Sequence, residues 1–134
     1  MKFISCMVTH DRPKQAIQTL QSLVFQTRPP DGIVIVENSS SCYRMHDDPM
    51  FVCLTNWAVE TGINVHFSLH MPLGMVGARI ECERIAVSLY PDQQTCFMVV
   101  DDDHIYVPDW VERVTKALEE FDVRRSCRSY RVSC

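Results

Sequence analysis

The segment at residues 97–110, FMVVDDDHIYVPDW, holds the side chains best suited to chemistry. Its apolar start leads directly into Asp101, Asp102 and Asp103, and adjacent carboxylates repel one another unless a positive partner lies among them. Mg²⁺ and Mn²⁺ prefer oxygen ligands and are often held by one or two carboxylates together with phosphate groups. Because alternate residues of an extended segment point the same way, Asp101 and Asp103 can share a face while Asp102 turns aside. The pattern favours a divalent-metal site; the alternative is a turn capped by Asp102 and Asp103, with Asp101 solvated.

Polar residues also follow two other apolar segments. Residues 9–12 (THDR) come after the first predicted strand and residues 37–39 (ENS) after the second, as residues 101–104 (DDDH) come after the fourth. Ligands of open parallel sheets bind outside the carboxyl ends of the strands, near the switch in strand order. If the first strand lies between the second and the fourth, the polar groups converge on one crevice. Periodicity alone does not supply that strand order.

The elements that must position these groups alternate along the chain. Strands are predicted at residues 3–9, 33–37, 64–69 and 97–101. Helical patterns begin at Asp11 with Pro13, at Asp47 or Asp48 with Pro49, near residue 75 and near residue 108. This order predicts an α/β, Rossmann-like fold with a mostly parallel sheet and helices on both faces. Helical spacing places Trp57, Leu89 and Trp110 on inward faces.

Length and composition narrow the class of protein. The 134 residues suffice for one domain, which we place at residues 1–121, followed by a basic, cysteine-containing tail at residues 122–134. The tail is either ragged or a strand with distant partners, and its pattern is not typical of a continued doubly wound domain. The net charge of −4 argues against a nucleic-acid partner. No apolar run could span a bilayer and no C-x-x-C pair predicts zinc, so we expect a cytoplasmic protein without a zinc site.

With these motifs in order, the chain resembles the N-terminal, nucleotide-sugar-binding half of a family 2 glycosyltransferase with the GT-A fold. Residues 3–40 resemble the family's opening strand, its T-Y-N-R-like turn, its Q-T-x-x-P and its V-D-D-G-S segment. Residues 72–89 resemble its glycine-rich turn and A-R-N helix, and residues 97–110 its D-x-D strand. The resemblance covers roughly residues 1–121 and implies a truncated GT-A-like domain.

The resemblance implies roles around the nucleotide base. Thr9 and the turn at Asp11 and Arg12 would border the base. Glu37 stands where the family has an aspartate that hydrogen-bonds the base, and Arg79 matches the arginine of A-R-N. Two alternatives stay open from the residues themselves: Glu37 can be only the polar end of a buried strand, and Arg79 a solvated residue paired with an acid one turn on.

The aspartates would hold the rest of the donor. By resemblance, Asp101 or Asp102 would contact the ribose, and Asp103, with Asp101, would ligate a divalent metal, Mn²⁺ or Mg²⁺, that bridges the diphosphate. The metal would stabilise charge on the departing nucleoside diphosphate. His104 is interpreted as a solvated turn residue rather than a further ligand.

The departures from the family pattern set up a second hypothesis. Glu-Asn-Ser replaces Asp-Asp-Gly at residues 37–39, Ile80 replaces the asparagine of A-R-N, and His10 with Asp11 replaces Tyr-Asn. The acceptor-binding half and its catalytic base are not found, so the catalytic residue and the acceptor stay unknown. The chain is then either a nucleotide-sugar-dependent transferase domain or a non-catalytic nucleotide-binding or protein-interaction module. A missing half would expose apolar surface, which predicts a homo-oligomer or a partner chain.

Overall fold

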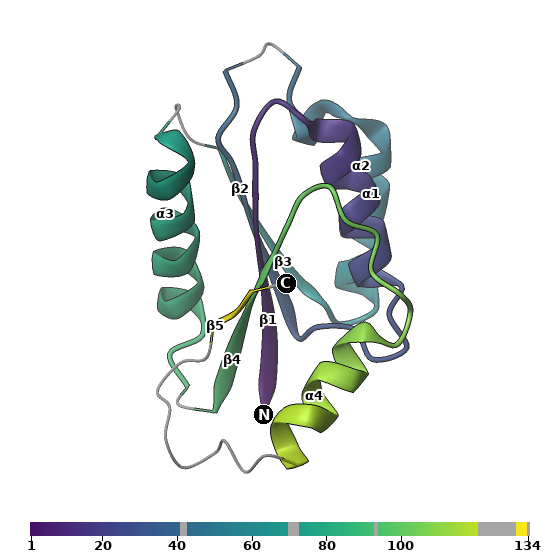
Figure 1. Cartoon of the computed structure of the whole chain (residues 1–134). Coiled ribbons are helices and arrows are strands. Elements are labelled where there is room, and N and C mark those ends of the chain that lie inside the picture. Colours follow the sequence, from purple (N-terminus) through teal and green to yellow (C-terminus); the bar gives the residue numbers. More distant parts are fainter. Residues whose placement is uncertain (41–42, 70–72, 93, 121–130, 134) are drawn as a thin grey trace.

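The computed structural model describes residues 1–40, 43–69, 73–92 and 94–120, and the backbone of residues 131–133 (Figure 1). Its elements, in chain order, are β1 (Lys2–Thr9), α1 (Pro13–Val24), β2 (Gly32–Glu37), the short 3₁₀ turn η1 (Met45–Asp47), α2 (Pro49–Glu60), β3 (Asn64–Leu69), α3 (Gly74–Leu89), β4 (Thr95–Val100), α4 (Trp110–Glu120) and β5 (Arg131–Ser133). The predicted strands and helices are all present, with ends shifted by at most two residues.

The sheet has the order β3-β2-β1-β4-β5, and every pair of neighbours is parallel. β1 therefore lies between β2 and β4, which confirms the strand order on which the predicted crevice depends. β5 pairs with β4, so residues 131–133 form a strand, which is one of the two alternatives left open for the tail; this strand extends the parallel sheet, which its sequence pattern did not indicate. The remainder of the tail, 122–130 and 134, lies outside the described residues. The fold is α/β and consistent with a Rossmann-like arrangement, as predicted.

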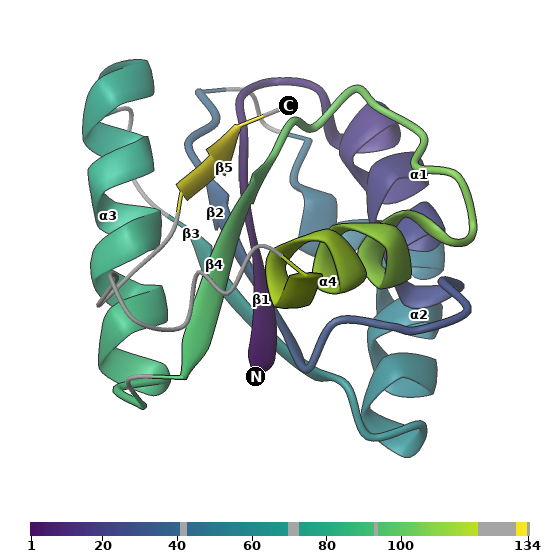
Figure 2. The ribbon, with the colours of Figure 1, turned by 60° about the horizontal axis from the view of Figure 1, so that its bottom comes forward.

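Alternation along β1 divides the core into two layers. Ile4, Cys6 and Val8 face α3, which among the described elements is the one helix on that side of the sheet. Phe3 and Met7 face the opposite side, which α1, α2 and α4 cover (Figures 1 and 2). Because both faces of the central strands are buried, β1 and β2 read as continuous apolar runs.

The helix ends and some inward positions differ from the sequence predictions. Asp48 caps α2 as expected, accepting a hydrogen bond from the backbone N–H of Met50 at 2.9 Å. Asp11 does not cap α1: the N-cap residue is Arg12, and no side-chain hydrogen bond caps the helix. Trp57 and Leu89 are exposed rather than buried, since each lies at the edge of its helix's inward face. Within the described part of the chain, no helix combines the length and the hydropathy needed to cross a bilayer.

Candidate functional site

The three aspartates lie at the carboxyl edge of the sheet, directly after β4. The exposed fractions of the side chains are 42% for Asp101, 6% for Asp102 and 45% for Asp103. This alternation agrees with the expectation that Asp101 and Asp103 share an open face while Asp102 turns aside. Two carboxylates are therefore accessible to a ligand, and one is held inside the fold.

Arg12 supplies the positive partner that the acidic turn needs. Its Nη2 lies 3.1 Å from Oδ1 of Asp102, and its Nη1 donates to Oδ2 of Asp103 at 3.0 Å. The planar guanidinium can reach two carboxylates at once because its donors are fixed in a fork. The sequence motifs predicted that Arg12 borders the base, and they did not indicate that it is the counter-ion of the aspartates. No sequence signal links the partners, since 91 positions separate Arg12 from Asp103.

Asp101 has its own cationic neighbours. Nη2 of Arg79, on α3, lies 3.8 Å from Oδ1 of Asp101. This contact supports the interpretation of Arg79 as a residue of this crevice. His104 Nδ1 lies 3.0 Å from Oδ1 of Asp103 and 3.9 Å from Oδ2 of Asp101. The carboxylates of Asp101 and Asp103 thus converge on a single point, which in this conformation is the imidazole ring of His104. His104 was predicted to be a solvated turn residue; its side chain is 58% exposed, and it also lies close to both carboxylates.

One face of α1 holds the acidic turn and the loop after it. Thr19 Oγ1 donates to the carbonyl of His104 at 2.8 Å, and Ser22 Oγ accepts from the backbone N–H of Tyr106 at 3.1 Å. Gln26 Nε2 then donates to the carbonyl of Val107 at 2.7 Å. Thr19 and Ser22 lie one turn apart on α1, and Gln26 lies two residues beyond the end of the helix. Together these three side chains fix the loop from residue 104 to residue 107.

Gln26 and Thr27, which form the Q-T of the Q-T-x-x-P pattern, also contact the segment around the start of α4. Gln26 Oε1 accepts from the backbone N–H of Val111 at 3.0 Å, and the backbone N–H of Thr27 donates to the carbonyl of Pro108 at 2.7 Å. Thr27 Oγ1 also donates to a carboxylate oxygen of Glu112 at 3.0 Å. The end of α1 is thereby joined to the start of α4, and this explains in structural terms why those residue types occur at that place.

Asp11 turns away from the aspartates and joins the loops after β1 and β2. Its φ is 52°, a left-handed conformation that costs energy for a residue other than glycine. Its carboxylate accepts from the backbone N–H of Ser40 at 3.0 Å and from that residue's hydroxyl at 2.8 Å, while its own N–H donates to Ser39 Oγ at 3.0 Å. Asp11 therefore shapes the crevice wall instead of lining the acidic turn.

Glu37 and Thr9 are placed at the crevice end of their strands but are buried. Glu37 is fully buried, and its Oε1 accepts from the backbone N–H of Met45 at 2.9 Å. Thr9 pairs with Glu37 across β1 and β2, and its hydroxyl is buried without a hydrogen-bond partner. In this conformation neither side chain is accessible to a nucleotide base. Glu37 closes the loop that leads into η1, which favours its interpretation as a buried polar strand end.

The donor set fits a metal that brings further ligands with it. Among the described residues, no group of three or more His, Cys, Asp or Glu side chains is arranged to hold a metal ion by itself. Asp101 and Asp103 nevertheless offer two half-exposed carboxylates that converge, and within the described part of the chain the buried Oδ2 of Asp102 has no hydrogen-bond partner. Mg²⁺ commonly takes one or two carboxylates and completes its shell with water and phosphate oxygens. Two carboxylates would leave most coordination positions of such an ion to ligands from outside the chain.

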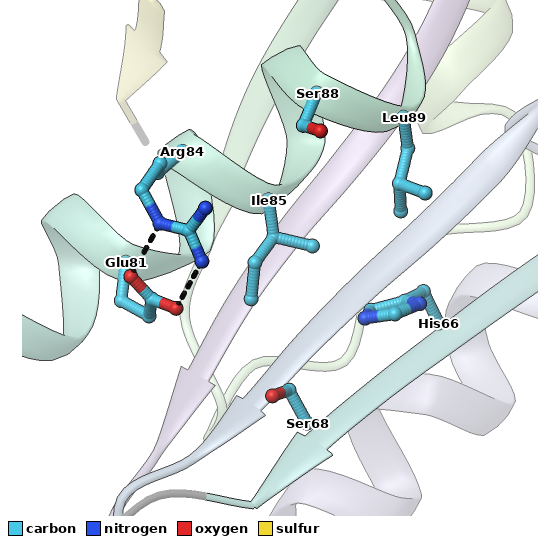
Figure 3. Close-up of a pocket in the computed structure, with 7 residues that line it drawn as sticks. All are labelled: His66, Ser68, Glu81, Arg84, Ile85, Ser88 and Leu89. Atoms are coloured by element: carbon cyan, nitrogen blue, oxygen red, sulfur yellow. Dashed lines mark hydrogen bonds and ion pairs between the residues drawn. The ribbon is translucent and has the colours of Figure 1, made fainter.

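A separate open cavity of about 350 Å³ lies between β3 and α3 (Figure 3). Its lining residues are His66, Ser68, Glu81, Arg84, Ile85, Ser88 and Leu89. Glu81 and Arg84 form a two-pronged ion pair along α3, with N–O distances of 2.7 and 2.8 Å, so their charges largely satisfy each other. None of the predicted site residues lines this cavity, and we place the chemistry at the acidic turn, where charges of both signs converge.

Cys6 and Cys82 are buried together between β1 and α3. The hydrogen bond with Cys82 and the burial raise the pKa of the Cys6 thiol far above its usual range. Such thiols are neutral core groups rather than nucleophiles or metal ligands. No protein-family model matches the chain, and the comparison with curated proteins found no match.

Proposed function

We propose that the chain is a GT-A-like domain that binds a nucleoside diphosphate sugar through a divalent metal, for glycosyl transfer to an acceptor. The observation that carries the proposal is the convergence of Asp101, Asp103, Arg12 and Arg79 at the carboxyl edge of a sheet whose first strand lies between the second and fourth. That edge is where parallel α/β sheets bind ligands, and its mixture of carboxylates and guanidinium groups suits a metal with an anionic ligand.

Each residue has a defined part in this proposal. Asp101 and Asp103 would hold Mn²⁺ or Mg²⁺, which supplies Lewis-acid stabilisation of the departing diphosphate when bound. Arg79 lies 3.8 Å from the carboxylate of Asp101 and would provide positive charge near the nucleotide. Asp102 is buried, so Asp101 is the better candidate for a ribose contact. Thr9, Asp11 and Glu37 would shape the base side of the crevice through its loops rather than by direct contact.

The experiment is calorimetric titration of UDP and of GDP into the purified chain, with and without Mn²⁺. We expect metal-dependent binding of one nucleotide and its loss in Asp103→Asn. A matched control is Asp109→Asn, which removes a half-exposed carboxylate outside the acidic turn and should leave binding unchanged. Equal loss in both variants, or binding that does not require the metal, would contradict the proposed site.

A second candidate is a non-catalytic α/β module that binds no donor. The Arg12 bridge favours it, because Asp102 and Asp103 already have a cationic partner from the chain itself. Absence of UDP and GDP binding at millimolar concentration, in a chain whose circular dichroism shows the folded state, would support this module. Nucleotide binding without release of sugar from any nucleotide sugar would indicate a donor site that has lost transfer.

Exposed apolar side chains occur at several places in the described residues, and one group of them lies on α3 and at its start. Apolar side chains are exposed there in a stripe made up of Leu73, Val76, Ile80 and Val87. We propose that a second copy of the chain covers this stripe, since exposed apolar stripes usually mark contacts. Sedimentation equilibrium tests it: Ile80→Glu should shift the chain toward the monomer, whereas a wild-type chain that is monomeric at all concentrations would contradict it.

A further inference from the structure

The contact from Arg12 lies on the carboxylate that a metal would share. Oδ2 of Asp103 accepts from Arg12 at 3.0 Å, and Oδ1 of the same carboxylate lies 3.0 Å from His104 Nδ1. A carboxylate has about four lone-pair sites, so a divalent ion could still use the remaining ones. Such an ion would then lie a few ångströms from the positive guanidinium of Arg12, and the two like charges would repel each other. Metal binding at Asp103 is therefore more favourable when Arg12 moves away from that carboxylate.

The Arg12 side chain can leave Asp103 and still keep its contact with Asp102. The Arg12 side chain is 43% exposed, so its contact with Asp103 lies in water and holds weakly. Its contact with Asp102 involves a carboxylate that is only 6% exposed, and the other oxygen of that carboxylate is buried without a hydrogen-bond partner. Losing that contact would leave a buried acid without its cation, which is costly. The weaker of the two contacts is thus the one with Asp103, at the proposed metal site.

We propose that Arg12 is a displaceable counter-ion that competes with the divalent metal for Asp103. Without a ligand, Arg12 spans Asp102 and Asp103 and neutralises the acidic turn. When a metal binds, Arg12 releases Asp103 and keeps Asp102. The competition weakens binding of the free ion, whose only protein ligands are the two carboxylates. A metal already complexed by a diphosphate brings additional oxygens and opposite charge, so the bridge selects the complex over the free ion. This inference rests on the proposed function, because it concerns the same metal.

The test measures binding of Mn²⁺ alone, by the electron paramagnetic resonance signal of the free ion, to wild type and to Arg12→Gln. Removing one positive charge a few ångströms from a divalent ion should tighten Mn²⁺ binding roughly tenfold at low salt, and less at high salt. Asp103→Asn should abolish binding in both backgrounds. Arg113→Gln removes an exposed arginine on α4 and is the matched control, with no expected change.

A second variant protects the test against misfolding, because Arg12→Gln also strips Asp102 of its partner. Arg12→Lys keeps a positive charge for Asp102, but its single ammonium group cannot form the fork that spans both carboxylates. We expect it to bind Mn²⁺ with an affinity between those of wild type and Arg12→Gln, with circular dichroism showing that each variant is folded.

The possible results separate the two proposals. Tighter binding in Arg12→Gln, including binding that is detectable only in the variant, supports the counter-ion. Equal Mn²⁺ affinity in wild type and Arg12→Gln would contradict the competition and would still agree with a metal site at Asp101 and Asp103. If neither folded protein binds Mn²⁺, the counter-ion proposal fails, and the calorimetric titration with nucleotide then decides separately whether the proposed function fails with it.

Discussion

Gln26 offers the sharpest test of how the acidic turn is held in place. Its amide is buried and makes two long-range hydrogen bonds, to the carbonyl of Val107 and from the backbone N–H of Val111, and a third to the carbonyl of Ser22 in the last turn of α1. Gln26→Leu keeps a similar volume but leaves these backbone groups without their partner. Leaving a buried polar group unsatisfied costs about 1–3 kcal/mol. With two such groups in the loop, we expect the free energy of unfolding to fall by roughly 2–4 kcal/mol.

The assay is urea denaturation followed by tryptophan fluorescence and by circular dichroism. Gln18→Leu is the matched control, since it makes the same change on an exposed position of α1 and should alter stability by no more than about 0.5 kcal/mol. A loss below 1 kcal/mol in Gln26→Leu, or an equal loss in both variants, would refute the argument that this side chain secures the loop. Because the loop follows the acidic turn, nucleotide binding should weaken in Gln26→Leu and not in the control.

Three further outcomes are expected. Glu37→Gln keeps an oxygen that accepts from the backbone N–H of Met45, so its free energy of unfolding should stay within about 1 kcal/mol of wild type. Glu37→Ala should lower the free energy of unfolding by roughly 3–4 kcal/mol in the same denaturation assay. Loss of UDP binding in a stable Glu37→Gln would show that the carboxylate contacts the nucleotide. Gly32→Ala would place its Cβ 2.2 Å from the Tyr90 hydroxyl oxygen and should cost about 1–3 kcal/mol, seen as a lower melting temperature; an unchanged one would show that Tyr90 moves freely. Iodoacetamide at pH 8 should label the exposed Cys53 rapidly and Cys6 only after unfolding, and rapid labelling of native Cys6 would refute its burial. Because the pKa of Cys6 is raised in the folded state, the thiol ionises first in the unfolded chain, and the free energy of unfolding should decline as the pH rises above about 9.

The chain's periodicity determined most of the fold. Continuous apolar runs predicted buried parallel strands, and Pro13, Pro49 and Asp48 marked helix starts, because these signals depend on neighbours within a few residues. The alternation of Asp101, Asp102 and Asp103 between open and buried positions also followed from local geometry. Such features are encoded by residues that are close in sequence.

What only the tertiary structure decided are the contacts between distant segments. The pairing of Arg12 with Asp102 and Asp103 and the hold of Gln26 on the loop before α4 each join residues more than 80 positions apart. The strand order and the parallel pairing of β5 belong to the same class. Glu37 shows the limit most clearly: the sequence left open whether it contacts a nucleotide base or is the polar end of a buried strand, and the loop after β2 buries it against the N–H of Met45. A residue's type limits the bonds it can make, but the packing of distant segments decides whether its atoms face a ligand or the interior.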